Sequence, residues 1–316
     1  MNKRKAVELV RKEIRRRNYA SRTEKSYIHW ITDFFGYHSE NSVDDIGKDE
    51  VVEYLNYLSE ERSVSGSTHN QALCAVKFLF DCLDKDMKGL NGLKQAKESK
   101  HLPTVLSPKE VRAILSRMSG RPKLIAFIQY GAGMRISEVV RLRINDIDFE
   151  NGQIYVRNAK GLKDRTTLLP DMLKKALTNQ VIRATKRNQK DKVRGYGEAP
   201  LPKALAKKYP NASKETGWQY LFPSSKISKG KRYHISPSTV QKALKRAVRV
   251  SGIHKKVSTH TLRHSFATQA LKSGVDIRTV QELLGHKNIR TTERYTHVIV
   301  KERIESPVES LLREIA

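Results

Sequence analysis

The chain has 316 residues, of which 61 are Lys or Arg and 33 are Asp or Glu, giving a formal charge of +28 at pH 7. This length corresponds to about two domains, each large enough to bury its own core. The charge far exceeds what solubility requires and predicts a polyanionic partner, which disfavours an enzyme that acts on neutral small molecules. Residues 1–100 carry a net charge of +2 and residues 101–316 carry +26, so the polyanion is expected to bind mainly in the second part.

Two further observations bear on the class of protein. No apolar segment follows the basic opening MNKRK, and no run approaches the roughly 18 apolar residues of a membrane span, so we expect a soluble intracellular protein without a membrane partner. Cys74 and Cys82 fit neither a disulfide framework nor a Cys-x-x-Cys metal site. We interpret both as reduced core residues.

Apolar residues at helical spacing predict an all-helical domain over residues 1–88. Ser21 and Glu24 form a Ser-x-x-Glu pattern, which predicts a helix N-terminus with a capping box. The stripe that follows comprises Tyr27, Ile28, Trp30, Ile31, Phe34 and Phe35. We assign this stripe to the core rather than to base stacking. Residues 89–103 lose the periodicity and gain Gly and Lys, which predicts an interdomain linker.

A second domain is expected over residues 104–316. Its first helix has a complete start signal, with Ser107 as N-cap, Pro108 at the first helical position and Glu110 as the capping-box carboxylate. A similar Ser-Pro signal at residues 236–237 predicts the start of a later helix.

One part of this second domain has the alternating pattern of β-strands. Residues 153–157 alternate between apolar and polar side chains, residues 158–164 can turn the chain and residues 165–169 can form the returning strand, which predicts a hairpin with Lys160 and Lys163 near its tip. After residue 180 a long basic segment punctuated by Gly and Pro extends to about residue 232. The predicted fold class is therefore mainly α with a small β-hairpin or sheet.

Two arginines are suited to hold one phosphodiester. Arg135 follows two glycines and is expected to begin a helix over residues 136–143, whose N-terminal amides and dipole favour a phosphate. His260 and Arg263 are three residues apart and share a helix face. Two guanidinium groups can hold both non-bridging oxygens and balance the charge of the transition state. Taken singly, Arg135 could be a surface residue, and His260 and His264 could be capping or core histidines.

A nucleophile and a proton donor complete this chemistry. Tyr295 is the candidate nucleophile, because nearby arginine charges would lower the cost of ionising its hydroxyl. A lysine at the hairpin tip could protonate the leaving 5′-oxygen, and Lys160 is a better candidate than Lys163. His260 and His286 could donate to the phosphate or handle the tyrosyl proton.

Glu138 lies one helical turn after Arg135 and could orient that arginine or its neighbours, or be a solvated helix residue. The sequence lacks the Asp/Glu cluster that a two-metal nuclease needs. We therefore expect phosphoryl transfer without a metal or another cofactor.

The ordered set of these residues resembles the tyrosine recombinase (phage integrase) family. Its members here are Arg135, Lys160, His260, Arg263, His286 and Tyr295, within segments that match GxRxSE, HxLRHSFAT, LGH and YTH at family spacing. The resemblance covers nearly the whole chain. It implies a two-domain DNA clamp, with a helical, SAM-like core-binding domain and a catalytic domain. It also implies that Tyr295 forms a 3′-phosphotyrosyl link to DNA, which conserves bond energy so that strands rejoin without ATP.

Within this family, residues from about 190 to 233 resemble the insertion of integron integrases. The resemblance implies that this insertion binds extrahelical bases of a folded single-stranded hairpin, the recombination site of a gene cassette. Lys203, Lys207 and Lys208 could meet phosphates. Trp218, or Tyr233 beside His234, could stack on a splayed base, whereas the alternative for Trp218 is an anchor to the core.

The last residues form a separate apolar pattern. Val308, Leu311, Leu312 and Ile315 predict a tail helix over residues 302–316 with an apolar stripe. The stripe could pack on its own domain, but the family resemblance implies docking into a neighbouring protomer, giving a homo-tetramer on two DNA sites.

The sequence thus predicts a site-specific recombinase that integrates and excises integron gene cassettes in the bacterial cytoplasm, associated with the nucleoid. Within the family, the alternative is a Xer-like or phage-type recombinase that acts on duplex sites. Two alternatives lie outside it: a type IB topoisomerase, and a basic DNA-architectural protein without turnover.

Overall fold

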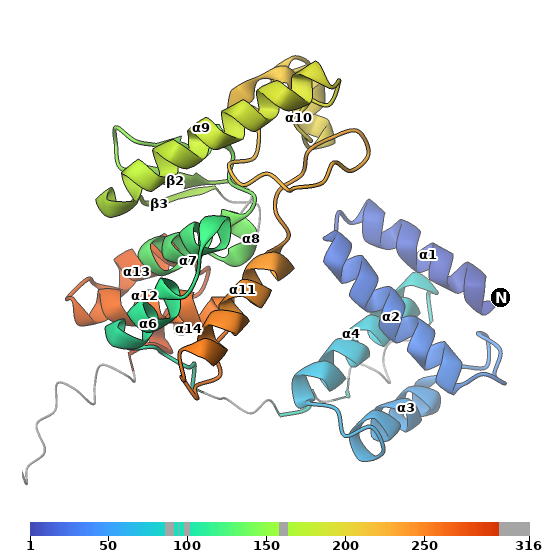
Figure 1. Ribbon diagram of the computed structural model, residues 1–316. Coiled ribbons are helices and arrows are strands. Elements are labelled where there is room, and N and C mark those ends of the chain that lie inside the picture. Colours follow the sequence, from blue (N-terminus) through green and yellow to red (C-terminus); the bar gives the residue numbers. More distant parts are fainter. Residues whose placement is uncertain (86–91, 94, 98–101, 158–163, 297–316) are drawn as a thin grey trace, which may run out of the picture. The chain divides into compact units, whose positions relative to one another are not determined.

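The computed structural model describes residues 1–85, 92–93, 95–97, 102–157 and 164–296, with the backbone only for residues 203 and 204. The chain divides into two compact units, Met1–His101 and Leu102–Ala316, called here the N-terminal and C-terminal units. The described chain is mainly helical with one small sheet, which confirms the predicted fold class (Figure 1). Within it, no helix combines the length and apolarity that crossing a membrane would take.

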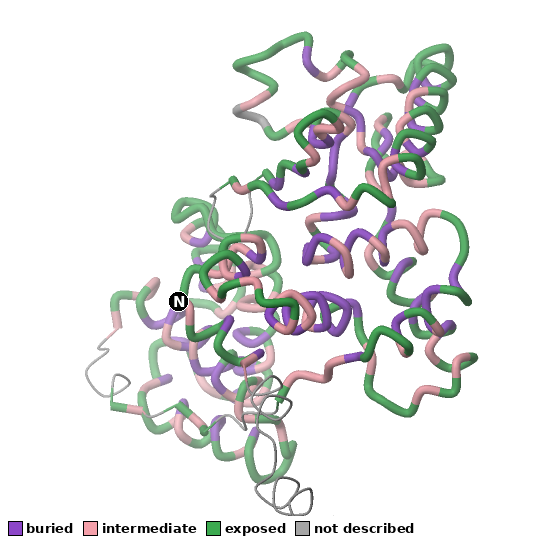
Figure 2. The backbone as a smooth tube through the Cα atoms, turned by 90° about the vertical axis from the view of Figure 1, so that its left-hand side faces the viewer, coloured by how far each residue is buried: buried purple, intermediate pink, exposed green. Residues whose placement is uncertain are grey.

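The N-terminal unit consists of helices packed around one core. Its helices are α1 (Lys3–Arg16), α2 (Ser21–Tyr37), α3 (Lys48–Glu60) and α4 (Gly66–Cys82). The aromatic stripe of α2 lies in this core as predicted, with Trp30, Ile31, Phe34 and Phe35 buried. Buried and exposed residues alternate along these helices, as the colours in Figure 2 show. The stripe therefore stabilises the unit and is withdrawn from base stacking.

The predicted capping box of α2 is wrong. Ser21 is the first helical residue, and Ala20 occupies the N-cap position without a side-chain hydrogen bond. The Glu24 carboxylate instead accepts from Arg15 of α1 at 2.8 Å and lies 3.5 Å from Arg11. Hydrogen bonds to guanidinium groups are stronger than those to a neutral backbone amide, so the contact between helices prevails over the local cap.

Both cysteines lie on α4 and are unpaired, as predicted. They are half-buried, at the edge of the core rather than inside it. Burial raises the pKa of the Cys82 thiol to about 11, so this sulfur stays protonated at neutral pH.

The C-terminal unit contains a small sheet and a larger set of helices. The sheet comprises β1 (Ile147–Asp148), β2 (Gln153–Val156) and β3 (Arg165–Leu168). The helices before and beside the sheet are α6 (Pro108–Ser116), α7 (Gly120–Ala132), α8 (Ile136–Val139), α9 (Asp171–Val193) and α10 (Lys203–Lys208). The remaining helices are α11 (Pro237–Val250), α12 (Thr259–Lys272), α13 (Ile277–Leu284) and α14 (Arg290–Glu293).

Both predicted helix starts of this unit are confirmed. Ser107 Oγ accepts from the Glu110 amide at 3.2 Å, and the Glu110 carboxylate accepts from the Ser107 amide at 2.8 Å. Ser236 caps α11, with Pro237 at its first position. These short signals are complete within four residues, which is why they can be read without the fold.

The predicted hairpin is also confirmed. β2 and β3 are antiparallel, with Ile154 opposite Thr167 and Val156 opposite Arg165, and β1 adds a third strand that the sequence did not indicate. Ile154 and Val156 are buried in the same apolar cluster as Leu177 of α9, which lies along the sheet (Figure 1). The hairpin tip, with Lys160 and Lys163, is outside the described residues.

A close approach of two helices brings the functional residues together. Gly133 ends α7 with a left-handed φ of 64°, and a Cβ at this position would lie 2.4 Å from the Phe266 ring of α12. Glycine therefore permits the end of α7 to contact α12 directly. The next residues, including Arg135, consequently start beside Arg263.

The segment after residue 180 begins as helix, since α9 continues to Val193. A buried ion pair holds the following chain onto this helix, because Arg232 Nη2 donates to Asp191 at 2.6 Å and Arg232 Nε donates to the second carboxylate oxygen. Both side chains are nearly inaccessible. The segment predicted as an insertion is thus fixed at both ends to one rigid helix.

Candidate active site

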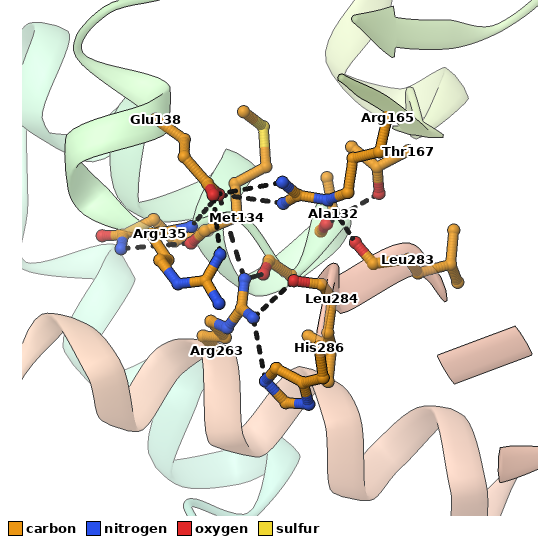
Figure 3. A network of polar contacts seen from close by, with 12 residues as sticks. Ala132, Met134, Arg135, Glu138, Arg165, Thr167, Arg263, Leu283, Leu284 and His286 are labelled. Carbon is orange, nitrogen blue, oxygen red and sulfur yellow. Dashed lines mark hydrogen bonds and ion pairs between the residues drawn. The ribbon is translucent and has the colours of Figure 1, made fainter. Parts of the chain in front are cut away.

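Arg263 lies at the centre of a polar network (Figure 3). Its side chain is 3% exposed, and its guanidinium donates to the carbonyls of Gly133 at 2.7 Å and Leu284 at 2.6 Å. Nη2 is also 3.1 Å from His286 Nε2. Burial and the charge of Arg135 lower the pKa of Arg263 to about 9, so it remains charged at neutral pH. These contacts fix the plane of the guanidinium.

A single carboxylate binds the arginines that converge here. Glu138 accepts from Arg135 Nη1 at 2.8 Å and from both Nη atoms of Arg165 at 3.1 and 2.9 Å. Arg263 Nη1 is 3.9 Å away. The expected contact between Glu138 and Arg135 is therefore present. Three guanidinium groups against one carboxylate leave a net positive charge, which suits an anion.

The helix expected over residues 136–143 is shorter than predicted. α8 ends at Val139, because the chain then pairs with a distant segment: the Leu221 amide donates to Leu142 at 2.8 Å, and the Ile144 amide donates to Gln219 at 3.1 Å. The Arg135 amide is also not free for a phosphate, since it donates to Glu138 at 2.8 Å. The anion-binding character of this site therefore comes from guanidinium groups rather than from a helix terminus.

Tyr295 lies just after α14 and is 3% exposed. Its hydroxyl is 2.8 Å from Nδ1 of His264 on α12. The His286 ring stacks on it, with ring centroids 6.4 Å apart and planes at 21°. Nδ1 of His286 is 2.9 Å from Thr292 Oγ1, so both nitrogens of this ring have partners. The structure thus brings Tyr295, His286 and Arg263 together.

Burial and positive charge set the protonation states here. Burial, with Arg263 and Arg135, lowers the pKa of His286 to about 3. Burial, with His260 and Arg263, lowers the pKa of His264 to about 4. Burial raises the pKa of Tyr295, although neighbouring arginines oppose this effect. At neutral pH the two histidines are neutral and the tyrosine carries its proton.

The other predicted residues of the reaction are placed differently. His260 is on the exposed side of α12, with its ring centroid 6.2 Å from that of His264. Lys160 lies outside the described residues.

Sequence reasoning missed the contacts of Arg165 and His264. The four-residue spacing from His260 to His264 places both on one helix face and could have indicated the second histidine. No sequence pattern indicated the contacts of Arg165, because its partners Glu138 and the Leu283 carbonyl are distant in sequence.

The candidate DNA-binding residues lie along the insertion. Trp218 is packed beneath Arg143 and Arg157, whose guanidinium carbons are 5.8 and 5.9 Å from its ring, and its carbonyl accepts from Arg143. Tyr233 is 38% exposed, whereas the half-buried His234 ring meets Tyr220 edge-on at 5.1 Å.

The three lysines that are predicted to contact phosphates lie on α10. Lys207 and Lys208 are exposed on this helix, and the Lys203 side chain is outside the described part. Together with Tyr233, these exposed groups are available to a ligand, while Trp218 has the contacts of an anchor.

Replacing Glu138 with glutamine is expected to destabilise the C-terminal unit by about 3–5 kcal/mol at pH 7, because buried arginines lose their counter-charge. Burial alone would raise the pKa of Glu138, but Arg165 and Arg135 lower it from 4.5 to about 2. Such a depressed pKa contributes about 3 kcal/mol of stability above pH 4.5, which is lost as the pH falls towards 2. The difference between the variant and the wild type should therefore shrink across this pH range.

Urea unfolding at several pH values measures this effect. Of the two tryptophans, Trp30 belongs to the N-terminal unit and Trp218 to the C-terminal unit, so a Trp30→Phe background reports the latter by fluorescence. Glu282→Gln, at an exposed position of α13, is the matched control and should change stability by no more than about 0.5 kcal/mol. Equal stability of Glu138→Gln and wild type at pH 7 would contradict the role of Glu138.

Comparisons with known proteins identify the family of this chain. Residues 104–302 match the phage integrase family, and residues 7–88 match the phage integrase N-terminal SAM-like domain. An integrase/recombinase from Escherichia coli is 42% identical over 316 residues, covering 97% of this chain and 94% of that protein. Tyrosine recombinase XerA from Pyrococcus furiosus is 34% identical over 268 residues, covering 82% and 80%.

Among solved structures, the XerH site-specific recombinase bound to its palindromic difH substrate after cleavage is similar. The TM-score is 0.63 with 25% identity, covering 89% of this chain and 78% of that one. The chain therefore belongs to the phage integrase family and is a tyrosine site-specific recombinase, an enzyme that cleaves and rejoins DNA.

Proposed function

We propose that Tyr295 is the nucleophile and that Arg135 and Arg263 hold the scissile phosphodiester. The Tyr295 Oη–P bond forms as the bond from phosphorus to the 5′-oxygen breaks, leaving a 3′-phosphotyrosyl link and a 5′-hydroxyl. Attack by the 5′-hydroxyl of another strand reverses these changes. The observation that carries the proposal is the buried side chain of Tyr295, whose ring stacks on His286, while His286 contacts Arg263 of the arginine cluster around Glu138.

Electrostatic stabilisation accounts for much of the rate. The transition state gains negative charge on the phosphate oxygens, where fixed cationic donors are each worth about 10²–10³ in rate. Arg263 is already fixed by Gly133, Leu284 and His286, so its reorganisation cost is small. Lys160 is the proposed donor of a proton to the 5′-oxygen, and the exposed His260 is a proposed phosphate ligand.

Covalent capture in the presence of a chelator tests this function. A nicked suicide duplex loses a short 5′-hydroxyl fragment on cleavage and traps the 3′-linked enzyme. We expect a protein–DNA adduct on a denaturing gel in EDTA, because the proposed charges come from side chains, and peptide mapping should place the link on Tyr295. Loss of the adduct in EDTA with recovery in Mg²⁺ would contradict reaction without a metal.

For the DNA substrate, we propose folded single-stranded hairpins of integron gene cassettes. Support comes from the exposed Tyr233, together with Lys207 and Lys208, on a segment fixed by the Arg232–Asp191 ion pair. Because Arg143 and Arg157 cover the ring of Trp218, we propose that Tyr233 is the residue that stacks on a base. The alternative is a Xer-like recombinase acting on duplex sites, and the likeness to XerA and XerH supports its Xer-like character.

A comparison of cleavage rates on a cassette hairpin and its fully duplex form separates these substrates. We expect faster cleavage of the hairpin, and Tyr233→Ala should slow that reaction by about 5- to 150-fold, the cost of one base stack. Tyr196→Ala, which removes another exposed tyrosine of the insertion, should change neither rate. A clear preference for the duplex would reject the cassette proposal and leave the recombinase assignment intact.

The assembly is proposed on the same basis. The predicted tail over residues 302–316 lies outside the described residues, and we propose that its apolar stripe docks into a neighbouring protomer to close a tetramer on two DNA sites. Each protomer would bind DNA with both of the domains predicted at residues 1–88 and 104–316. We place this activity in the bacterial cytoplasm, at the DNA of the nucleoid.

A further inference from the structure

We propose that His264 is a catalytic residue of the cleavage step and takes the proton of the Tyr295 hydroxyl. The inference rests on the proposed function of Tyr295 as nucleophile. The sequence pointed to His260 and His286 for this proton. Among the described residues, however, His264 is the histidine whose ring nitrogen is within hydrogen-bond distance of Tyr295 Oη, at 2.8 Å.

Neither His260 nor His286, the two histidines predicted for this proton, has a ring nitrogen directed at the Tyr295 hydroxyl. His286 uses Nε2 towards Arg263 and Nδ1 towards Thr292, so it stacks on the tyrosine ring without a nitrogen left for the hydroxyl. His260 is exposed and meets the ring of His264. His260 is therefore available to the phosphate, His286 positions Arg263, and His264 contacts the nucleophile.

The backbone of His264 is fixed by a rigid element. α12 is buried along most of its length, and Ser265, the next residue, accepts from the Leu106 amide at 2.9 Å and donates to Thr261 at 2.8 Å. A base held on such a helix keeps its distance to Oη without reorganisation. His264 is therefore positioned before substrate binds.

Charges around His264 couple proton transfer to the substrate. Tyr295 and His286 lie next to it. The positive charges or dipoles that act on its pKa come from His260, Arg263 and Arg294. Burial and the last three lower the pKa of His264 to about 4, so it is neutral in the free enzyme. The tautomer with its proton on Nε2 presents the Nδ1 lone pair to Oη, and this is the tautomer that the proposal requires. A bound phosphodiester adds a negative charge beside these cations, and the transition state adds more. Both favour protonated His264, which becomes a stronger base only when DNA is present.

The step balances in protons and bonds. The Oη–P bond forms while the proton of Oη moves to Nδ1 of His264, and the bond from phosphorus to the 5′-oxygen breaks as a separate donor protonates that oxygen. In rejoining, the bond from the 5′-oxygen to phosphorus forms while the 5′-hydroxyl returns its proton to the separate donor. The phosphotyrosyl bond breaks as His264 returns its proton to Oη. No oxidant or cofactor is needed.

Two substitutions at His264 separate proton transfer from positioning. His264→Asn keeps a hydrogen-bonding group near the position of Nδ1 but cannot take a proton, and His264→Ala opens space for a small base. We expect single-turnover cleavage of the nicked suicide DNA to fall by about 10²–10⁴ in both variants. His264→Asn should lose the rise in rate with pH on the acid side, and imidazole in the medium should partly restore His264→Ala.

Two controls make the result specific. His254→Asn changes an exposed histidine of the same unit and should cleave like the wild type. A substrate with sulfur as the bridging 5′ atom needs no protonation of its leaving group, so it should restore Lys160→Ala but not His264→Ala. Gel-shift affinity for the DNA verifies that each variant is folded.

The proposal is overturned if His264→Asn cleaves at the wild-type rate. It is also overturned if both variants cleave slowly but keep the wild-type pH profile, and if imidazole does not raise the cleavage rate of His264→Ala. His264 would then only position the tyrosine. Failure of the wild type to form any adduct would instead reject the function proposed for Tyr295. The wild-type reaction therefore distinguishes the two failures.

Discussion

Tyr295→Phe is expected to abolish covalent capture of DNA while DNA affinity changes by less than about threefold. The substitution removes the attacking oxygen and its hydrogen bond to His264 and keeps the buried ring stacked on His286. Loss of one such hydrogen bond costs about 0.5–1.5 kcal/mol of stability, too little to unfold the unit. Denaturing gels of the suicide reaction measure capture, and gel shifts at a stated salt concentration measure affinity.

Tyr196→Phe is the matched control, since Tyr196 is 42% exposed in the same unit. It should form the adduct at the wild-type rate. An adduct that survives in Tyr295→Phe would assign the nucleophile to another residue. Loss of DNA binding together with capture would show that the hydroxyl serves the fold rather than the reaction.

Arg263→Lys is expected to slow cleavage by about 10³ despite retaining the charge. The guanidinium contacts Gly133, Leu284 and His286 at once and still has donors for a phosphate, whereas an ammonium is a compact point charge without this planar fork. The carbonyls of Gly133 and Leu284 would each lose a fixed donor. Removal of one preorganised donor to a developing charge typically costs about 10²–10³ in rate, and here the orientation of His286 is lost as well.

Single-turnover rates at saturating DNA measure this effect, with Arg278→Lys on the exposed side of α13 as the control. The slope of log affinity against log salt should stay within about one unit of the wild type, because the number of cationic phosphate contacts is unchanged. A rate within threefold of the wild type would show that charge alone suffices at this position.

Several features of the fold could be predicted from the sequence because their causes are local. The Ser107–Glu110 capping box and the Ser236–Pro237 start are complete within a few residues, so their hydrogen bonds follow from the sequence pattern. The alternation in β2 and the helical spacing of the α2 aromatics fix which sides are buried. The excess of basic residues likewise indicated a polyanionic partner.

Other features were decided by partners far away in the chain. Glu24 forms an ion pair with Arg15 instead of the expected capping box. The helix after Arg135 ends early because residues 142–144 pair with residues 219–221. In each case a contact between elements outweighed a local preference of about 1 kcal/mol.

The sequence by itself determined the helical class, the starts of α6 and α11 and a first set of candidate groups for DNA cleavage. Only the tertiary structure assigned those groups to one another: Arg165 to Glu138, His286 to Arg263, and His264 to the Tyr295 hydroxyl. The physical reason is that Gly133 lets α7 approach α12, and this contact joins residues more than a hundred positions apart. Periodicity carries no information about such distant pairs, since it reports which face of an element is buried but not what covers it.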